Sequence, residues 1–248
     1  MTPDTLLTLF GDAAAAAGVA IGTLTGPARR HRTEQPGQYA LDLVADRAVL
    51  DVLHRADVGV VSEESGRSGH AGAEVTVVVD PVDGSTNCAR DLPYWGVSLC
   101  ALDHDGPLCA LVANQATGTQ TVAIREGGAW RDGTRVEASR VRDVSKAVVA
   151  VSGMPRERVG WAQFRALGST ALALCDVAAG NLDGYLDGGV WDAPWDYLGG
   201  ILACTEAGAV VVDGADRPLS VADPEARRQV LAAATPDLLN SLLPAVVA

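Results

Sequence analysis

The sequence is poor in basic side chains. Its 248 residues contain 19 Lys and Arg against 31 Asp and Glu, which gives a formal net charge of −12. Such a chain repels the nucleic-acid backbone unless a local basic patch intervenes. The only basic clusters are short, at residues 29–32 and 227–228. We therefore expect no nucleic-acid partner.

Several catalytic signatures are also missing. Lys146 is the only lysine and lies in no GxxxxGK[ST] context, which excludes a P-loop. There is no GxGxxG and no GxSxG, and the four histidines offer no obvious base for a Ser-His-Asp hydrolase. The five cysteines are scattered and form no CxxC pair. They favour reduced core thiols in the cytoplasm over zinc or redox chemistry.

The sequence also shows no pattern that we would expect of a membrane span or of a signal peptide. No apolar run reaches the length that we expect of a membrane span. The Ala-rich segment DAAAAAGVAIG near the start lacks a basic leader, so it predicts a helix rather than a signal peptide. With 48% apolar residues, the chain is expected to fold as a globular protein that has no membrane partner.

The remaining pattern alternates helices and strands. Apolar residues at helical spacing, with start and stop signals, predict helices over 4–19, 41–55, 169–179, 195–207 and 236–246. Apolar runs predict strands over 57–62, 75–79, 96–102, 107–113, 119–125, 148–152, 183–186, 209–212 and 230–234, with a polar loop at 65–73. This order indicates a layered α+β sandwich. We divide it into an N-terminal α+β half, 1–140, and a C-terminal α/β half, 141–248.

The segment VVVDPVDGSTN, residues 77–87, carries the strongest chemical signal. Asp80 and Asp83 lie at the end of a buried strand, and Gly84 permits a tight turn in which the backbone N–H groups of Gly84, Ser85 and Thr86 point outward. That arrangement suits an anion such as phosphate. Two neighbouring carboxylates repel each other, and a hard divalent cation such as Mg²⁺ relieves this repulsion. The spacing does not match an EF-hand, and a simple DG turn is the structural alternative.

Two further acidic positions strengthen the metal interpretation. Glu63 follows a predicted strand in VVSEESG, residues 60–66, and Asp196 begins a predicted helix in PWDYLGGILACTEAGA, residues 194–209. An Asp at a helix start is by itself usually an N-cap. The combination with Asp80 and Asp83 is what indicates a metal site.

Together, DPVDGSTN, EES and WD…TEAGA, in this order, resemble the inositol monophosphatase family. The family belongs to the Mg²⁺-dependent, lithium-sensitive phosphatase superfamily, which includes the fructose-1,6-bisphosphatases. The resemblance extends over nearly the whole chain through DLVADRAV, GVSLCAL, GGAWRDGTRV and LGSTALALCDVAAGNLDGYLD. It implies an α-β-α-β-α sandwich and a cytoplasmic, homodimeric phosphatase of a small phosphorylated metabolite.

The resemblance also implies site residues. Two or three Mg²⁺ ions, with Mn²⁺ as an alternative metal, would be held by Glu63, Asp80, the carbonyl of Val82, Asp83 and Asp196. Of the two WD pairs in DGGVWDAPWD, the second is preferred over Asp192, because Asp196 lies ten residues before Glu206 as the family spacing requires.

Catalytic and substrate roles follow from the same resemblance. Either hydroxyl, that of Ser85 or that of Thr86, could help Glu63 to orient the attacking water; Thr86 is preferred, with Ser85 as a phosphate donor, and Asp46 would lie behind the hydroxyl. The substrate would be bound by Asp83, Gly84, Ser85, Thr86, Gly168, Ser169, Thr170, Asp187 and Asp196. The mechanism implied is in-line hydrolysis by two-metal catalysis without a phosphoenzyme.

Two departures from the family pattern concern the substrate. No lysine precedes DLVAD, and two extra residues separate Asp187 from the second WD. Inositol monophosphate or a related sugar or polyol phosphate is the first expectation. Histidinol phosphate, a nucleotide such as 3′-phosphoadenosine 5′-phosphate, and a regulatory metal-binding role with weak turnover stay open.

Overall fold

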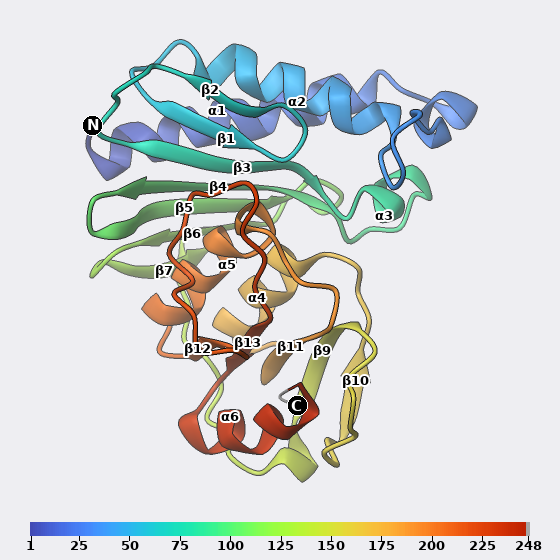
Figure 1. Ribbon diagram of the computed structural model, residues 1–248, viewed down its shortest axis with the longest axis vertical. Helices are drawn as coiled ribbons and strands as arrows, with labels where there is room; N and C mark the ends of the chain where they lie inside the picture. The colour runs from blue at the N-terminus through green and yellow to red at the C-terminus, as the bar shows by residue number, and fades with distance from the viewer. Residues whose placement is uncertain (247–248) are drawn as a thin grey trace.

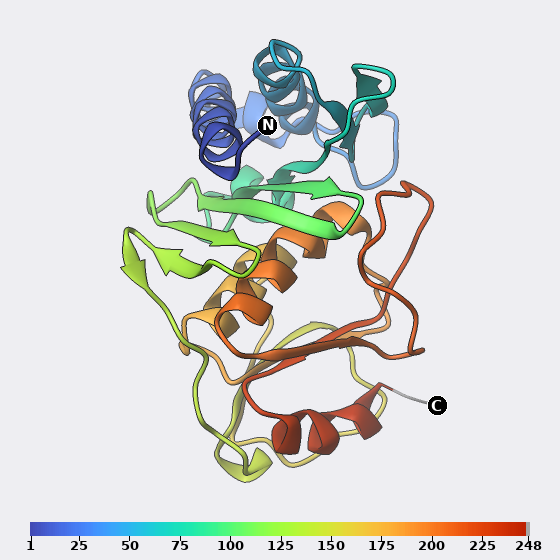
Figure 2. The ribbon, with the colours of Figure 1, turned by 90° about the vertical axis from the view of Figure 1, so that its left-hand side faces the viewer.

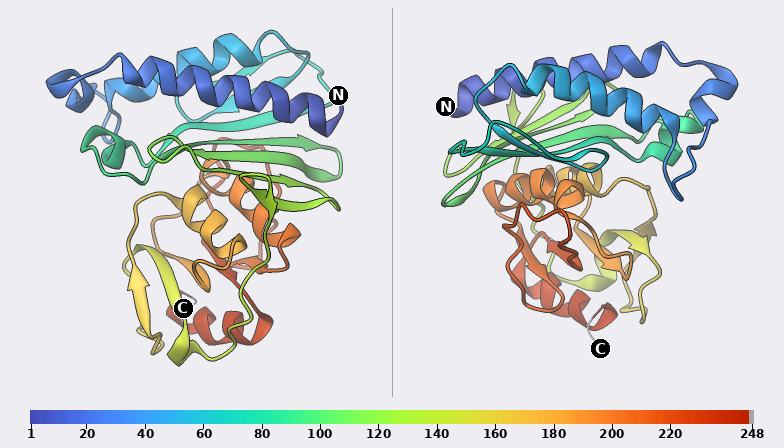
Figure 3. Two further views of the ribbon diagram at one scale, coloured as in Figure 1. Left: turned by 180° about the vertical axis from the view of Figure 1, so that it is seen from behind. Right: turned by 45° about the horizontal axis from the view of Figure 1, so that its top comes forward.

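Five layers of secondary structure stack along the long axis of the protein in the computed structural model, which describes residues 1–246 (Figure 1). They are a helix pair, an eight-stranded sheet, a second helix pair, a five-stranded sheet and a final helix. The outer helical layers lie at opposite ends of the molecule (Figure 3). The predicted α-β-α-β-α sandwich is confirmed.

The first layer consists of α1 (Pro3–Gly22) and α2 (Ala40–Leu53), joined through the short 3-10 helix η1 (Gly26–Arg30). Helix α1 meets the length and hydropathy of a membrane-spanning helix, contrary to our expectation that no segment would. One face of α1, including Leu6, Phe10 and Ile21, is buried in a core shared with α2 and the first sheet. One such helix is weak evidence for a membrane, because buried core helices have the same composition.

The first sheet has the strand order β2-β1-β3-β4-β5-β6-β7-β8. The strands are β1 (Gly59–Ser62), β2 (Gly66–Gly69), β3 (Thr76–Asp83), β4 (Gly96–Asp103), β5 (Gly106–Asn114), β6 (Gln120–Ile124), β7 (Gly128–Arg131) and β8 (Thr134–Arg135). Part of the predicted loop 65–73 is strand β2, because residues 66–69 pair antiparallel with β1 despite their polar, Gly-rich composition. Between β3 and β4 lies the short helix α3 (Ser85–Ala89).

Helices α4 (Thr170–Ala178) and α5 (Pro194–Glu206) form the middle layer, between the two sheets (Figure 2). They contact each other closely because Gly200 has no side chain. A Cβ at this position would lie 2.5 Å from the Cβ of Leu174. Residues from both sheets and both helices share one buried cluster. This packing positions the N-termini of α4 and α5 beside the end of β3.

The second sheet has the order β10-β9-β11-β13-β12 and is covered by the last helix. Its elements are β9 (Val148–Gly153), β10 (Gln163–Arg165), β11 (Gly184–Gly188), β12 (Val210–Asp213) and β13 (Val230–Ala233), with η2 (Val144–Lys146), α6 (Pro236–Leu242) and η3 (Leu243–Ala245) around them. The first sheet ends at residue 135 and the second begins at residue 148. We keep the division into 1–140 and 141–248 as an interpretation.

Candidate metal and phosphate site

A β-bulge turns Asp80 and Asp83 toward the same side of β3. Side chains three residues apart on a regular strand point to opposite faces. Here Asp80 pairs with Ser98 and Asp83 with Gly96, so β3 contains one extra residue at this point. Pro81, which has no N–H to donate to the ladder, lies within the bulge. One carboxylate oxygen each from Asp80, Asp83 and Asp196 then lie within 4.8 Å of one another.

Gly84 starts helix α3 immediately after the two aspartates. Its φ of +91° is in the left-handed region, and a Cβ would lie 3.0 Å from the carbonyl oxygens of Gly168 and Tyr94. Both features favour glycine. The first-turn amides of a helix have no intrahelical acceptor. Gly84 and Ser85 line the same cavity as the carboxylates, so the first-turn amides of α3 are candidate donors for an anion there.

Asp196 comes from the first turn of α5. Its Oδ2 accepts a hydrogen bond of 2.6 Å from the amide of Ala193, which holds the carboxylate at the helix start. The other aspartate, Asp192, is directed elsewhere, because its carboxylate accepts hydrogen bonds from the hydroxyls of Thr170 and Tyr185. The geometry therefore favours Asp196 over Asp192 as a metal ligand.

Desolvation raises the pKa of every carboxyl group in this cluster. The pKa of Asp83 rises to about 6, offset in part by hydrogen bonds from Ser169 and the first amides of α4. The pKa of Asp196 rises to about 7 through burial and the charge of Asp83. Those of Asp80 and Glu63 lie well above their usual range, through burial and then mutual repulsion with neighbouring carboxylates.

A divalent cation fits this donor set. Among residues 1–246, no Lys or Arg forms an ion pair with Glu63, Asp80, Asp83 or Asp196. Within residues 1–246 these carboxylates therefore have no direct ion pair, and only the charge of the more distant Arg227 acts on Asp196. Hard oxygen donors of this kind are the ligands that Mg²⁺ prefers.

A cavity of about 260 Å³ contains the cluster. Its lining consists of residues 35–38 with Asp42, Glu63, Glu64, Asp80, Val82, Asp83, Gly84, Ser85 and Asp196. Gln38 is one of these lining residues and donates a hydrogen bond to the carboxylate of Glu64. The carboxylates and the start of α3 line the same cavity, so a cation and an anion could bind there next to each other.

Comparison with known proteins assigns the chain to a family. The family model described as "Inositol monophosphatase family" matches residues 8–248. The chain belongs to this family. Its members are metal-dependent phosphatases, typically with Mg²⁺, that act on phosphate monoesters.

Individual relatives cover most of the chain. A fructose-1,6-bisphosphatase of Pyrococcus furiosus is 31% identical over 206 residues, 82% of this chain and 81% of its own. The Nus factor SuhB of Escherichia coli (strain K12) is 30% identical over 190 residues, 70% of each chain. A Pyrococcus horikoshii protein described as similar to inositol-1 monophosphatase shares the fold with a TM-score of 0.89, at 24% identity and full coverage of both chains.

Two sequence-predicted residues of this family member lie away from the cavity lining. Asp46 accepts hydrogen bonds from the hydroxyls of Ser62 (2.5 Å) and Ser65 (3.3 Å) and forms none with Thr86 among the described residues. The hydroxyl of Thr86 lies 3.5 Å from that of Tyr39 and does not line the cavity.

Asp42 and Ser85 line the cavity instead. Asp42 is 4% exposed, and its Oδ2 accepts the amide of Tyr39 at 2.7 Å. Its buried Oδ1 has no hydrogen-bond partner in the described chain. Burial raises the pKa of Asp42 to about 7. The only sequence signal for Asp42 was its position at the start of α2, three residues after Tyr39.

A second cavity, of about 310 Å³, lies on the other side of Asp83 and Asp196, which line both cavities. Its wall includes the predicted residues Gly168, Ser169 and Thr170. The hydroxyl of Ser169 already donates to Asp83 at 2.6 Å. This segment therefore hydrogen-bonds the candidate metal ligand Asp83 and also lines the second cavity beside it.

Asp187, predicted to bind substrate hydroxyls, does not line this cavity. It is fully buried, and its carboxylate accepts the amides of Gly189 (2.9 Å), Val190 (2.6 Å) and Trp191 (2.7 Å). The carboxylate thus holds the loop that follows β11. Asp192, which the sequence offered only as a reserve metal ligand, lines the cavity instead.

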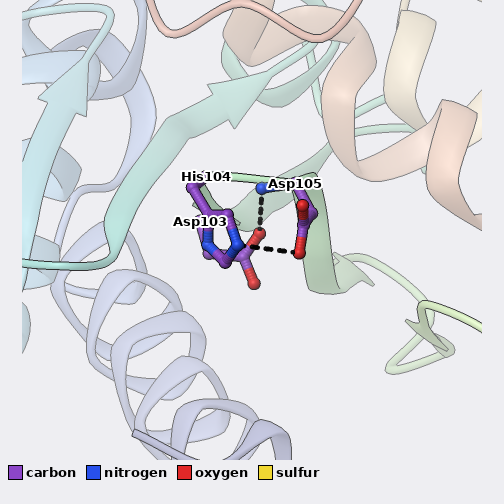
Figure 4. Close-up of side chains that lie close together, drawn as sticks. All are labelled: Asp103, His104 and Asp105. Atoms are coloured by element: carbon purple, nitrogen blue, oxygen red, sulfur yellow. Dashed lines mark hydrogen bonds and ion pairs between the residues drawn. The ribbon is translucent and has the colours of Figure 1, made fainter.

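Two other acidic features have structural explanations. Glu206 of the EAG segment accepts the amides of Glu126 and Gly128, both at 2.8 Å, and so fixes the β6–β7 turn. Asp103, His104 and Asp105 gather at the exposed β4–β5 turn (Figure 4). Two hydrogen bonds from Arg125 occupy the carboxylate of Asp103 and lower its pKa to about 2.

Proposed function

We propose that this protein is a Mg²⁺-dependent phosphatase that hydrolyses a small phosphate monoester. Glu63, Asp80, the carbonyl of Val82, Asp83 and Asp196 would hold the metal. One observation carries the proposal: the buried carboxylates of Asp80 and Asp83 and the half-buried one of Asp196, which form no ion pair with a described Lys or Arg, line one cavity with Gly84 and Ser85 at the start of α3. A cation and a phosphate group thus have adjacent sites with complementary donors and acceptors.

The bound ions supply Lewis-acid stabilisation of phosphate charge and lower the pKa of a coordinated water. The residues of the chain position the phosphate group and the carboxylates that would hold the metal. The amides of Gly84, Ser85 and Thr86 donate hydrogen bonds to phosphate oxygens, and the N-terminus of α4 keeps the carboxylate of Asp83 in place. These groups exist in the folded chain before substrate arrives, so the phosphate meets a preorganised site.

For the attacking water we propose Glu63 together with Ser85 and Asp42. This replaces the expected Thr86 and Asp46. The support is that Ser85 and Asp42 line the cavity, and that the buried Oδ1 of Asp42 has no other partner in residues 1–246. An unpaired buried oxygen is costly unless something in the cavity donates to it. A hydroxyl or water held between Ser85 and Asp42 would satisfy it.

The substrate class follows the family. Inositol monophosphate or a related sugar or polyol phosphate is the first proposal, and the fructose-1,6-bisphosphatase relative supports a sugar phosphate. The relatives named Nus factor SuhB favour testing a regulatory role too. Cytoplasmic location, a homodimeric state and the absence of a nucleic-acid partner stay predictions. All five cysteines are buried and free, which suits a reducing compartment.

The test is phosphate release from a panel of monoesters, with and without Mg²⁺. The panel contains inositol 1-phosphate, glucose 6-phosphate, histidinol phosphate, fructose 1,6-bisphosphate and 3′-phosphoadenosine 5′-phosphate. We expect Mg²⁺-dependent release that falls by at least about 100-fold in Asp83→Asn, because a group that stabilises transition-state charge is lost.

The matched control is Asp105→Asn, which removes the same charge from the exposed β4–β5 turn and should leave turnover unchanged. Equal turnover of Asp83→Asn and the wild type would overturn the site assignment. Folded protein that binds Mg²⁺ in a calorimeter but releases phosphate from no ester would favour the regulatory role.

A further inference from the structure

Asp192 is a buried acid that the proposed hydrolysis does not use. It is 3% exposed and forms no ion pair with any described Lys or Arg. Its Oδ1 accepts a hydrogen bond from the hydroxyl of Thr170 at 3.2 Å, and its Oδ2 accepts one from the hydroxyl of Tyr185 at 2.9 Å. Burial of a carboxylate without a cation is unfavourable, and two neutral hydroxyls compensate it only in part.

The position of Asp192 connects it to the substrate. It lines the 310 Å³ cavity together with Thr170 and Tyr185, and this cavity shares Asp83 and Asp196 with the metal and phosphate site. An organic group attached to a phosphate at that site would therefore have the second cavity directly beside it. No Lys or Arg lines it.

The nearby Arg227 is occupied elsewhere. Its guanidinium lies 5.5 Å from the centre of the Trp195 ring and donates to the backbone carbonyls of Pro224 and Ala226. It is not among the residues that line the second cavity. The cavity thus presents acid and hydroxyl groups to a ligand without a basic group beside them.

The loop between β11 and α5 explains why this acid faces the cavity. The amides of residues 189–191 donate hydrogen bonds to the carboxylate of Asp187 and hold it away from the second cavity, which it does not line. The chain then turns at Trp191, whose φ is +69°, and the carbonyl of Asp192 accepts the amide of Arg228 at 2.9 Å. These contacts fix the backbone on both sides of Asp192 and hold its side chain against Tyr185.

We propose that Asp192 binds a protonated amino group, so that the preferred substrate is a phosphate monoester of an amino alcohol or amino sugar. The proposal rests on the phosphatase function above. An ammonium group carries the missing positive charge and three N–H donors. The carboxylate and the hydroxyl oxygens of Thr170 and Tyr185 are acceptors for them. A neutral hydroxyl would add a hydrogen bond but no charge, and a second phosphate group would be repelled.

Matched ester pairs test this preference in the Mg²⁺-loaded protein. Glucosamine 6-phosphate is compared with glucose 6-phosphate and N-acetylglucosamine 6-phosphate, and O-phosphoethanolamine with propyl phosphate. We expect kcat/KM to be about 10- to 100-fold higher for the amine in at least one set, the range for a hydrogen bond to a charged group. Equal values for amine and neutral esters in both sets would refute the proposal.

Two variants assign the preference to Asp192. Asp192→Asn keeps the shape but removes the charge, and should reduce the amine preference to about threefold or less. Tyr185→Phe removes one hydroxyl and keeps the charge, so the preference should persist. Melting temperatures of both variants verify folding. An unchanged preference in folded Asp192→Asn would overturn the assignment.

Failure of the phosphatase function itself is distinguishable. If no ester releases phosphate although Mg²⁺ binds, the proposed function fails, and calorimetric binding of the same pairs decides the inference independently. Tighter binding of the amine members, lost in Asp192→Asn, supports it. Equal binding of amine and neutral members contradicts it.

Discussion

Removal of divalent metal ions should make the stability of this protein fall as the pH rises from about 4 to about 7. In the metal-free protein the pKa of Asp83 is raised from 3.8 to about 6, and those of Asp42 and Asp196 from 3.8 to about 7. Between these pH values the folded chain binds more protons than the unfolded chain. The free energy of unfolding therefore decreases with pH across this window.

The size of the effect follows from the raised pKa values. A carboxyl group whose pKa rises from 3.8 to about 7, as for Asp196, weakens folding by on the order of 4 kcal/mol when it ionises in the native state. We expect a loss of at least about 2 kcal/mol between pH 4.5 and 7.5, or a melting temperature lower by about 4–8 °C for a chain of this length. The Asp103–Arg125 pair acts in the opposite sense, but below about pH 4, because the pKa of Asp103 is about 2.

The assay is urea unfolding followed by tryptophan fluorescence, in EDTA at a series of pH values and again in Mg²⁺. The metal should raise stability most at high pH, where the carboxylates are ionised and free to bind it. Asp196→Asn should give a shallower pH dependence in EDTA because one ionising group is gone. Stability that stays constant or rises over this window in EDTA, with the same profile in Asp196→Asn, would refute the electrostatic reasoning.

Two further predictions concern catalysis and packing. Ser85→Ala should lower Mg²⁺-dependent turnover by about 100-fold or more, whereas Thr86→Val should lower it less than about 10-fold, because only Ser85 lines the cavity. Similar losses in both variants would contradict this assignment. Gly200→Val should lower the free energy of unfolding by about 3 kcal/mol or more in urea titrations, since its Cβ would meet Leu174 at 2.5 Å. Gly11→Ala is the control: a Cβ there meets nothing within 4 Å, so stability should rise by up to about 1 kcal/mol.

Local sequence carried much of the metal site. A buried valine run that ends in DPVDG predicts a strand and a tight turn, and both appear in β3 and at Gly84. The resemblance to the family, through its spacing between the WD motif and the later Glu206, favoured Asp196 over Asp192, and the structure places Asp196 with Asp80 and Asp83. The strand and the turn depend on backbone conformations that short segments impose on themselves, so neighbouring residues were sufficient evidence for these two features.

Strand β2 and the bulge in β3 depend on pairing instead. The polar segment 66–69 becomes a strand only because β1 lies beside it. Asp80 and Asp83 share one side only because the ladder with β4 shifts by one residue. No spacing along the chain contains this information, since a bulge is defined by the partner strand.

Tertiary structure alone decided between chemically equivalent neighbours. Asp42 and Asp46 lie four residues apart on the same side of α2, so helical periodicity treats them alike. The pairing of Asp46 with Ser62 and Ser65, brought from the end of β1, leaves Asp42 for the cavity.

The same holds for the substrate side of the site. Asp187 and Asp192 lie in one loop, and backbone amides that fold over Asp187 leave Asp192 to face the second cavity. The sequence by itself determined which residue types gather at the end of β3 and what metal they suit. Only the folded chain determined which of these carboxylates line a cavity and which are turned away from it, because the segments that form the cavities are distant in the sequence.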